Sequence, residues 1–146
     1  MEELKFRYQQ LKKAYKRLNY MLGQYKQAFK EVNVAHTEDT ENEYMTYRDA
    51  LITRFSFCYD LTWKFLKLVL KVHHSIEANS PRKVFNDCYA QGIINDNEVR
   101  ALINMIDARN ETAHVYDELR ADMVGKKIGS YVDLFDGIAA KCAQYQ

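Results

Sequence analysis

The sequence predicts an all-α protein that folds as an antiparallel bundle of about five helices. Helix breakers are scarce, since the 146 residues include one proline and five glycines. Hydrophobic residues make up 47% of the chain and aromatic residues 13%, which predicts a buried core and argues against disorder. The length fits one domain, which we expect to span residues 1–146.

The first predicted helix begins near Leu4 and runs for about 28 residues, because its apolar residues recur with the spacing of a long bundle helix. They form two rows with a seven-residue spacing, Leu4, Leu11, Leu18 and Tyr25 in one and Tyr8, Tyr15, Leu22 and Phe29 in the other. The polar run from His36 to Glu43 then predicts a loop.

The second predicted helix runs from Tyr44 to about His74 and is hydrophobic on several sides. Apolar residues recur at spacings of three and four, and others, including Trp63, fill the remaining faces. Such broad hydrophobicity indicates either the centre of a bundle or a surface packed on a second subunit.

Two shorter helices follow. Ser80 and Pro81 supply a cap and a first-turn proline for a third helix, which we expect to end near Gly92. A fourth helix should begin at about Asn95, where the sequence Asn-Asp-Asn-Glu offers capping groups, and end near Thr112.

The fifth predicted helix begins at Asp117 and ends at about Ala143. Asp117 and Glu118 suit this start because acidic side chains are stabilised at the positive end of a helix.

Charge and cysteine content exclude several classes of protein. The 21 basic and 20 acidic residues give a net charge of +1, so nucleic-acid binding would have to come from a local basic patch. Cys58, Cys88 and Cys142 are widely spaced, which predicts reduced thiols and neither a disulfide framework nor a zinc site. No apolar signal-peptide core or membrane-spanning run is present, so we expect a cytoplasmic protein with no membrane partner.

Motifs for nucleotide transfer are absent. The sequence has no glycine-rich phosphate loop and no Gly-Ser turn followed by an Asp-x-Asp pair, so the chain should not itself transfer nucleotides. His73 and His74 would point about 100° apart on a helix and would not chelate one ion together. We expect neither a metal site nor a cofactor.

The candidate site lies in the segment from Ile106 to Glu118, which joins the fourth and fifth predicted helices. Arg109 and His114 would lie about 140° apart on one continuous helix. If the fourth helix ends near Thr112, the bend before Asp117 can bring the guanidinium and the imidazole together.

An arginine and a histidine, with Asn110 and Tyr116 nearby, suit phosphodiester chemistry that needs no metal. Histidine exchanges a proton near neutral pH, and arginine stabilises charge on phosphate oxygens. The reaction implied is attack of an RNA 2′-hydroxyl on the adjacent phosphate. In the alternative interpretation, Arg109 and His114 only cap the helix and pair with acidic neighbours, namely Asp107, Glu111 or Glu118.

Asp60 lies in the most hydrophobic predicted helix, where an unpaired carboxylate would be costly. It either lies on an exposed face with Lys64 as its partner, or points inward and orients a basic residue such as Arg109.

Three ordered motifs resemble a known family. They are RFSFCYDLTWKFLK (Arg54 to Lys67), SPRKVFNDCYAQGII (Ser80 to Ile94) and MIDARNETAHVYDE (Met105 to Glu118). In that order they resemble the nucleotidyltransferase substrate-binding protein family of the HEPN superfamily, and the resemblance spans nearly the whole chain.

The resemblance implies a homodimeric helical bundle that works with a separately encoded minimal nucleotidyltransferase and binds RNA or a nucleotide. Related HEPN proteins are metal-independent RNase toxins, in which an Arg-x4-His pair is catalytic. That pair maps to Arg109 and His114, with Asn110 as a positioning group and Tyr116 as a site of adenylylation by the partner. Members of the family were first viewed as the substrate-binding half of a split nucleotidyltransferase. The competing interpretation is therefore a non-catalytic adaptor that presents substrate to the partner enzyme.

Overall fold

The computed structural model of the chain is a bundle of α-helices, and it describes residues 2–146. The helices are α1 (Glu2–Val34), α2 (Glu38–His74), α3 (Pro81–Ala90), α4 (Asp96–Glu111) and α5 (Glu118–Cys142), with short 3₁₀ turns η1 (Thr112–His114) and η2 (Ala143–Tyr145). No strand occurs within residues 2–146. The predicted all-α bundle of five helices is therefore confirmed.

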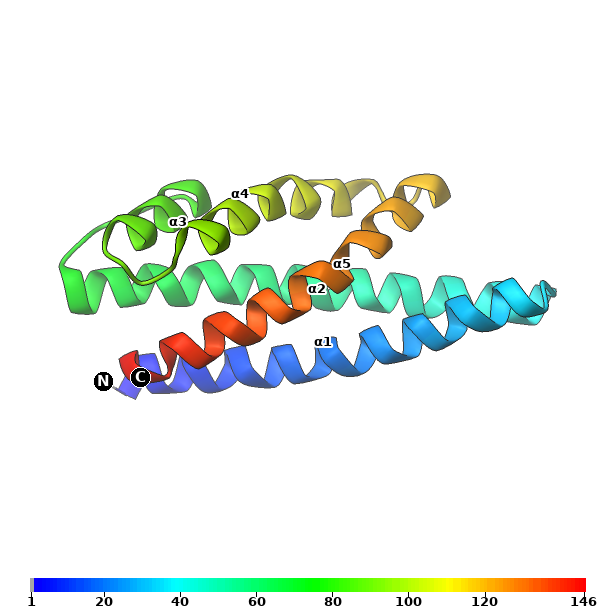
Figure 1. Ribbon diagram of the computed structural model, residues 1–146, viewed down its shortest axis with the longest axis horizontal. Coiled ribbons are helices and arrows are strands. Elements are labelled where there is room, and N and C mark those ends of the chain that lie inside the picture. Colours follow the sequence, from blue (N-terminus) through cyan, green and yellow to red (C-terminus); the bar gives the residue numbers. More distant parts are fainter. Residues whose placement is uncertain (1) are drawn as a thin grey trace.

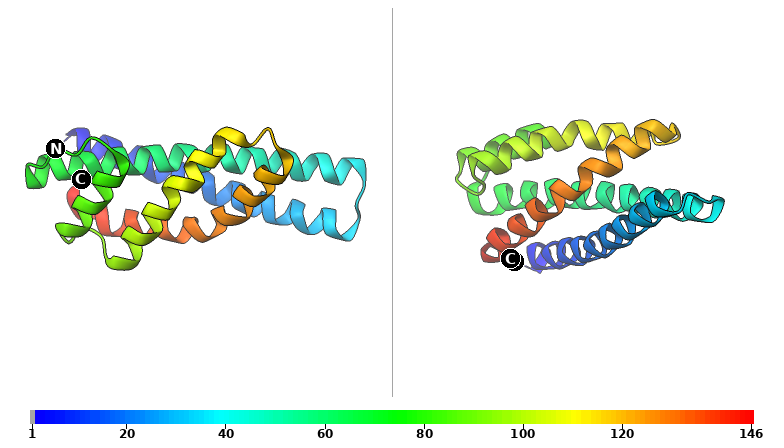
Figure 2. Two further views of the ribbon diagram at one scale, coloured as in Figure 1. Left: turned by 90° about the horizontal axis from the view of Figure 1, so that it is seen from above. Right: turned by 45° about the vertical axis from the view of Figure 1, so that its right-hand side comes forward.

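The two longest helices, α1 and α2, form an antiparallel hairpin (Figure 1). Helix α5 runs obliquely across both, while α3 and α4 cover the side of α2 away from α1 (Figure 2). Helix α2 contacts all four other α-helices, as expected for the centre of a bundle. The ends of α1 and α5 meet where the Tyr8 hydroxyl donates a hydrogen bond to the Ala139 carbonyl at 2.7 Å.

The apolar stripe predicted on α1 faces the core. Buried positions on this helix continue the seven-residue rows over most of its length, at Leu4, Tyr8, Leu11, Tyr15, Leu18, Leu22 and Tyr25. The last predicted member, Phe29, is 39% exposed. It still lies 5.9 Å from the ring of Tyr44 on α2, so the stripe ends at the edge of the bundle.

The loop predicted from His36 to Glu43 is wrong, because α2 already begins at Glu38. Thr37 is the residue that starts the helix. Its hydroxyl accepts a hydrogen bond from the Thr40 amide at 3.1 Å, and its own amide donates to the Thr40 hydroxyl at 2.9 Å. This reciprocal capping satisfies free amides of the first turn, and the acidic residues that follow are stabilised by the helix dipole. A polar run therefore encodes a helix start here.

The predicted ends of the shorter helices agree with the structure. Ser80 caps α3, and Asn95 and Glu98 form the capping pair that starts α4, with both hydrogen bonds at 2.8 Å. Gly92 follows α3 with a φ of 75°, a backbone conformation that glycine adopts without strain.

Aromatic residues of α2 and α5 fill the centre of the bundle. Phe55 lies 6.3 Å from Phe135, which stacks on Tyr15 of α1 at 4.8 Å. The three cysteines are reduced and buried. Burial raises the pKa of the Cys58 and Cys142 thiols to about 12. None of the helices within residues 2–146 is both long and apolar enough to cross a membrane.

Candidate functional site

The segment that carries Arg109 and His114 changes direction where the sequence predicts. Helix α4 ends at Glu111, the chain continues through η1, and α5 begins at Glu118. Asp117 caps α5, since its carboxylate accepts hydrogen bonds from the amides of Leu119 and Arg120 at 3.0 and 3.3 Å. The site residues thus lie on a helix end and the turn after it.

The Arg109 guanidinium is held in place from two sides. Its Nε and one terminal nitrogen donate to the Asp60 carboxylate at 3.4 and 3.3 Å, and its other terminal nitrogen donates to the Thr112 hydroxyl at 2.9 Å. Because a guanidinium has five N–H groups and these contacts use three, two remain for another acceptor. Arg109 is oriented and still able to bind a phosphate oxygen.

Within residues 2–146 Asp60 pairs with Arg109 and not with Lys64, as the second of the two alternatives predicts, but it stays partly exposed and does not point into the core. The side chains of Arg109 and Asp60 are 34% and 38% exposed, which leaves the pair open to solvent. The neighbouring Tyr59 is buried, and burial followed by the charge of Asp60 raises its pKa to about 12. Tyr59 therefore stays neutral beside the ion pair.

His114 lies half-buried at the end of η1, on the C-terminal side of Thr112. Its Nδ1 is buried and has no hydrogen-bond partner within residues 2–146. The imidazole ring meets the ring of Tyr116 edge-on at 6.1 Å. Since Nδ1 is enclosed, Nε2 is the ring nitrogen left to meet a substrate.

Arg109 lies on the last turn of α4, and His114 lies at the end of η1. Within the described residues no hydrogen bond or ion pair joins their side chains. In the described part of the chain, neither side chain pairs with Asp107, Glu111 or Glu118, the partners of the capping alternative. Arg109 binds Asp60, and Glu118 binds Arg48.

The other two candidates lie on the surface of this turn. Asn110 is exposed on the last turn of α4, directly after Arg109. Tyr116 is 80% exposed and lies just before the cap of α5. Both side chains are accessible to a substrate or to another protein.

A surface depression of about 330 Å³ borders the ion pair. Asp60 is part of its lining, together with Ala14 of α1 and Arg54, Phe57 and Leu61 of α2. The Arg54 guanidinium lies 5.7 Å from the centre of the Phe57 ring. Within residues 2–146, no group of three or more His, Cys, Asp or Glu side chains is arranged to hold a metal ion.

A protein-family model described as "Nucleotidyltransferase substrate binding protein like" matches residues 6–144, nearly the whole chain. The chain belongs to this family. A crystal structure of a protein from Thermus thermophilus has the same fold, with a TM-score of 0.72 and 25% sequence identity over 91% of this chain and 98% of that chain. No curated protein sequence matches the chain.

One residue that supports the candidate site was not predicted from the sequence. Arg48 of α2 is only 1% exposed and binds three carboxylates. Its guanidinium donates to Asp122 at 2.8 Å, to Glu118 at 2.7 Å and to Asp49 at 3.0 Å. Burial alone would lower the pKa of Arg48, but these hydrogen bonds outweigh it and the pKa is raised above its ordinary value.

The Arg48 cluster fixes the beginning of α5 on α2, because Glu118 and Asp122 lie on the first turns of α5. His114 and Tyr116 come directly before those turns, so the cluster also limits where they lie. A signal was present in the sequence. Arg48 falls on the same helical stripe as the buried residues Leu51, Ile52 and Phe55, where an arginine needs partners.

Proposed function

We propose that this chain is a HEPN-type subunit that cleaves RNA without a metal ion and works with a separately encoded minimal nucleotidyltransferase, as the toxin of a toxin–antitoxin pair. In this proposal residues 1–146 form one HEPN-like domain that acts as a homodimer. The observation that supports it is the orientation of Arg109 by Asp60 and Thr112, one turn before a histidine whose Nδ1 is enclosed.

The proposed reaction is cleavage of the phosphodiester bond by the neighbouring 2′-hydroxyl. The 2′-oxygen forms a bond to phosphorus while the bond to the 5′-oxygen breaks, which leaves a 2′,3′-cyclic phosphate and a 5′-hydroxyl. His114 accepts the proton of the 2′-hydroxyl through Nε2, and the departing oxygen receives a proton from solvent. The two unused N–H groups of Arg109 stabilise the extra negative charge on the phosphate. Asp60 orients Arg109, and exposed Asn110 positions the substrate.

Tyr116 provides the proposed control. Its hydroxyl attacks the α-phosphate of ATP on the partner enzyme, so that AMP becomes attached to the tyrosine and pyrophosphate leaves. Its exposure of 80% makes it accessible to that enzyme. A nucleotide beside His114 would crowd the phosphate site and repel RNA by its charge.

The second candidate is a non-catalytic adaptor that binds a nucleotide or another substrate and presents it to the partner nucleotidyltransferase. The description of the matched family as substrate-binding favours it. In that case Arg109 and Asn110 bind the substrate, and His114 transfers no proton.

Cleavage of RNA by the purified protein in the presence of a metal chelator discriminates between the two. We expect products ending in a cyclic phosphate, and a loss of about 100-fold or more in rate for His114→Ala and for Arg109→Gln. Asp107→Asn is the matched control, since Asp107 is an exposed acid on the same helix, and it should cleave normally. Equal, absent cleavage by the wild type and His114→Ala would support the adaptor.

Two measurements test the partner and the assembly. Incubation with the partner nucleotidyltransferase and ATP should add the mass of one AMP group to the wild type and not to Tyr116→Phe. Sedimentation at micromolar concentration should give the mass of two chains, and the mass of one chain would contradict the homodimer.

A further inference from the structure

One row of side chains runs along a face of α2 that is not buried in the core. Positions 54, 57, 61, 64, 68 and 71 alternate in spacing between three and four residues, which places them on one face of the helix. All are exposed or half-buried: Arg54, Phe57, Leu61, Lys64, Leu68 and Lys71. Three of its members are basic, three are apolar, and none is acidic. We call these six residues the α2 row.

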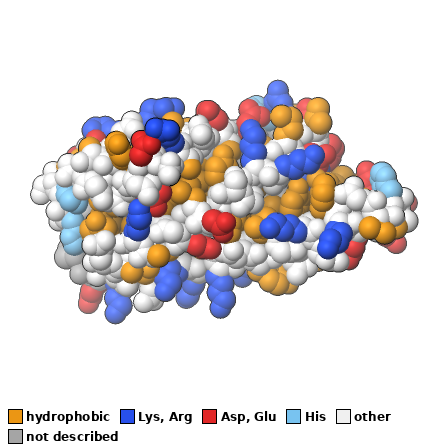
Figure 3. Space-filling view, viewed as in Figure 1, with side chains coloured by type: hydrophobic (Ala, Val, Ile, Leu, Met, Phe, Trp, Pro, Cys, Tyr) orange, Lys and Arg blue, Asp and Glu red, His pale blue; other side chains and the backbone are white. Residues whose placement is uncertain are grey.

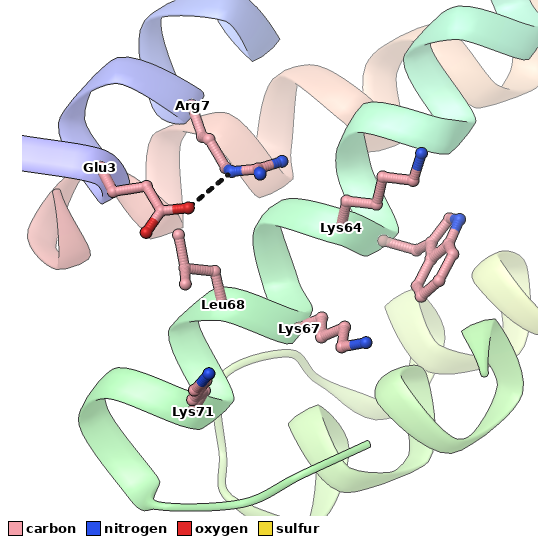
Figure 4. Close-up of a pocket in the computed structure, with 7 residues that line it drawn as sticks. Glu3, Arg7, Lys64, Lys67, Leu68 and Lys71 are labelled. Atoms are coloured by element: carbon pink, nitrogen blue, oxygen red, sulfur yellow. Dashed lines mark ion pairs between the residues drawn. The ribbon is translucent and has the colours of Figure 1, made fainter. Parts of the chain in front are cut away.

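Two depressions border the α2 row, and α1 forms the opposite side of both. The first is the one beside Asp60, where Ala14 belongs to α1. The second, of about 310 Å³, lies further along the hairpin toward the start of α1, where Arg7 and Glu3 face Lys64 and Lys71 (Figure 4). Because α1 and α2 are antiparallel, the two depressions follow one another along the hairpin, and we call the two together the groove.

The groove is positively charged although the chain as a whole is nearly neutral. Lys64 and Lys67 border the second depression and form no ion pair within residues 2–146, and the Lys71 ammonium lies 4.0 Å from Glu77 with both side chains well exposed. The acid of this depression, Glu3, is already paired with Arg7 at 3.4 Å (Figure 4). By contrast, basic and acidic side chains intermingle on the face seen in Figure 3.

We propose that the α2 row binds the backbone of single-stranded RNA and leads the strand to Arg109 and His114. Arg54, Lys64 and Lys71 contact separate phosphates along the strand, and a base stacks on Phe57, which is 49% exposed. Asp60 connects the path to the site, since it lines the first depression and also binds Arg109. The inference rests on the proposed RNA-cleaving function and names how that substrate is held.

The positive charge of the α2 row favours RNA over a second copy of this chain as its binding partner. Two copies packed through the α2 row would bring basic side chains face to face without acidic partners from either row, which costs free energy. A polyanion instead releases its counterions when it meets these cations. The half-exposed Phe57 adds a platform for an unpaired base, which a double helix does not offer.

Fluorescence anisotropy with a labelled single-stranded RNA tests the path, in a His114→Ala background that prevents cleavage. The α2-row variant carries Arg54→Gln, Lys64→Gln and Lys71→Gln. We expect binding at least 10-fold weaker, and a slope of log affinity against log salt that is smaller by about 2, since three phosphate contacts are lost. The matched control carries Lys26→Gln, Lys30→Gln and Lys127→Gln, which are exposed lysines outside the groove, and should bind nearly as the parent does. Equal weakening in both variants, or no binding by the parent at low salt, would overturn the proposal.

The single tryptophan gives a second, local readout that needs no change in charge. Trp63 lines the second depression, so bound RNA should quench or shift its emission. Unchanged emission at saturating RNA would show that the strand lies elsewhere and would overturn the path.

If RNA binds through the α2 row but wild type does not cleave it, the proposed RNase fails and the path stands. If the α2-row substitutions leave the rate of RNA cleavage unchanged, the path fails and the proposed RNase stands.

Discussion

The carboxylate of Asp60 on α2 accepts two hydrogen bonds from the guanidinium of Arg109 on α4, at 3.4 and 3.3 Å. The contact joins residues 49 positions apart and fixes the last turn of α4 against the central helix. It orients Arg109 and leaves some of its N–H groups free to donate to another acceptor.

Asp60→Asn tests whether this contact positions Arg109. The amide keeps the shape but loses the charge, so the guanidinium gains freedom, and we expect RNA cleavage about 10-fold slower with KM little changed. Because the pair is partly exposed, the free energy of unfolding should fall by less than about 1 kcal/mol. Cleavage kinetics and urea denaturation measure the two effects. A large loss of stability with normal cleavage would mean that Asp60 serves the fold alone.

Arg48→Met should lower the free energy of unfolding by about 2–4 kcal/mol, because three charged hydrogen bonds are lost and two acids at the start of α5 are left without their cation. The matched control is Arg100→Met, which removes an ion pair between side chains that are 74% and 53% exposed and should cost less than about 1 kcal/mol. Urea denaturation compares them, and equal losses would contradict the role of Arg48.

Three glycines provide a matched comparison of packing. A Cβ at Gly125 would lie 3.2 Å from Cγ of Arg48 and 3.4 Å from the Tyr25 hydroxyl, whereas nothing lies within 4 Å of one at Gly23 or Gly137. Gly23→Ala and Gly137→Ala should each raise the free energy of unfolding by about 0.5–1 kcal/mol, since alanine favours a helix. Gly125→Ala should give no gain or a loss, because Arg48 is held by its carboxylates. A similar gain at all three positions would contradict the close packing.

The stability of the protein should fall in alkaline solution. Burial raises the pKa of Cys58 and Cys142 from 9.0 to about 12, and that of Tyr59 from 10.0 to about 12. In each case the folded state keeps its proton more tightly than the unfolded state. Their contribution is therefore full below about pH 9 and is lost as the pH rises toward 12. Urea denaturation across this range should show the decline, and Cys58→Ala should make it less steep. A flat profile would exclude this linkage.

The helix ends that were predicted correctly depend on residues close together in sequence. Ser80 before Pro81, Asn95 with Glu98, and Asp117 each satisfy free amides within three residues, so the pattern alone carries the information. The same chemistry at Thr37 and Thr40 was missed, because a long polar run resembles a loop and a threonine pair is a less familiar form of the capping box.

The candidate site likewise has some features that local sequence predicts and others that it does not. A turn between Thr112 and Asp117 follows from local signals, and Arg109 was one of two partners predicted for Asp60, the other being Lys64. The partners of Arg48 could not be inferred, because Glu118 and Asp122 come 70 and 74 residues later in the chain. Their meeting depends on how α5 crosses α2, which no local pattern specifies.

The meeting of the α1 and α5 ends has a practical consequence for work on the groove. The start of α1 and the end of α5 lie side by side (Figure 1). Glu3, at the start of α1, lines the second depression, so an affinity label or dye attached beyond either helix end would lie close to the groove. A circular permutant, joined by a short flexible linker there and opened in the turn between Val34 and Glu38, should keep every helix intact. It would carry its labels at the opposite tip of the hairpin and leave the groove unobstructed.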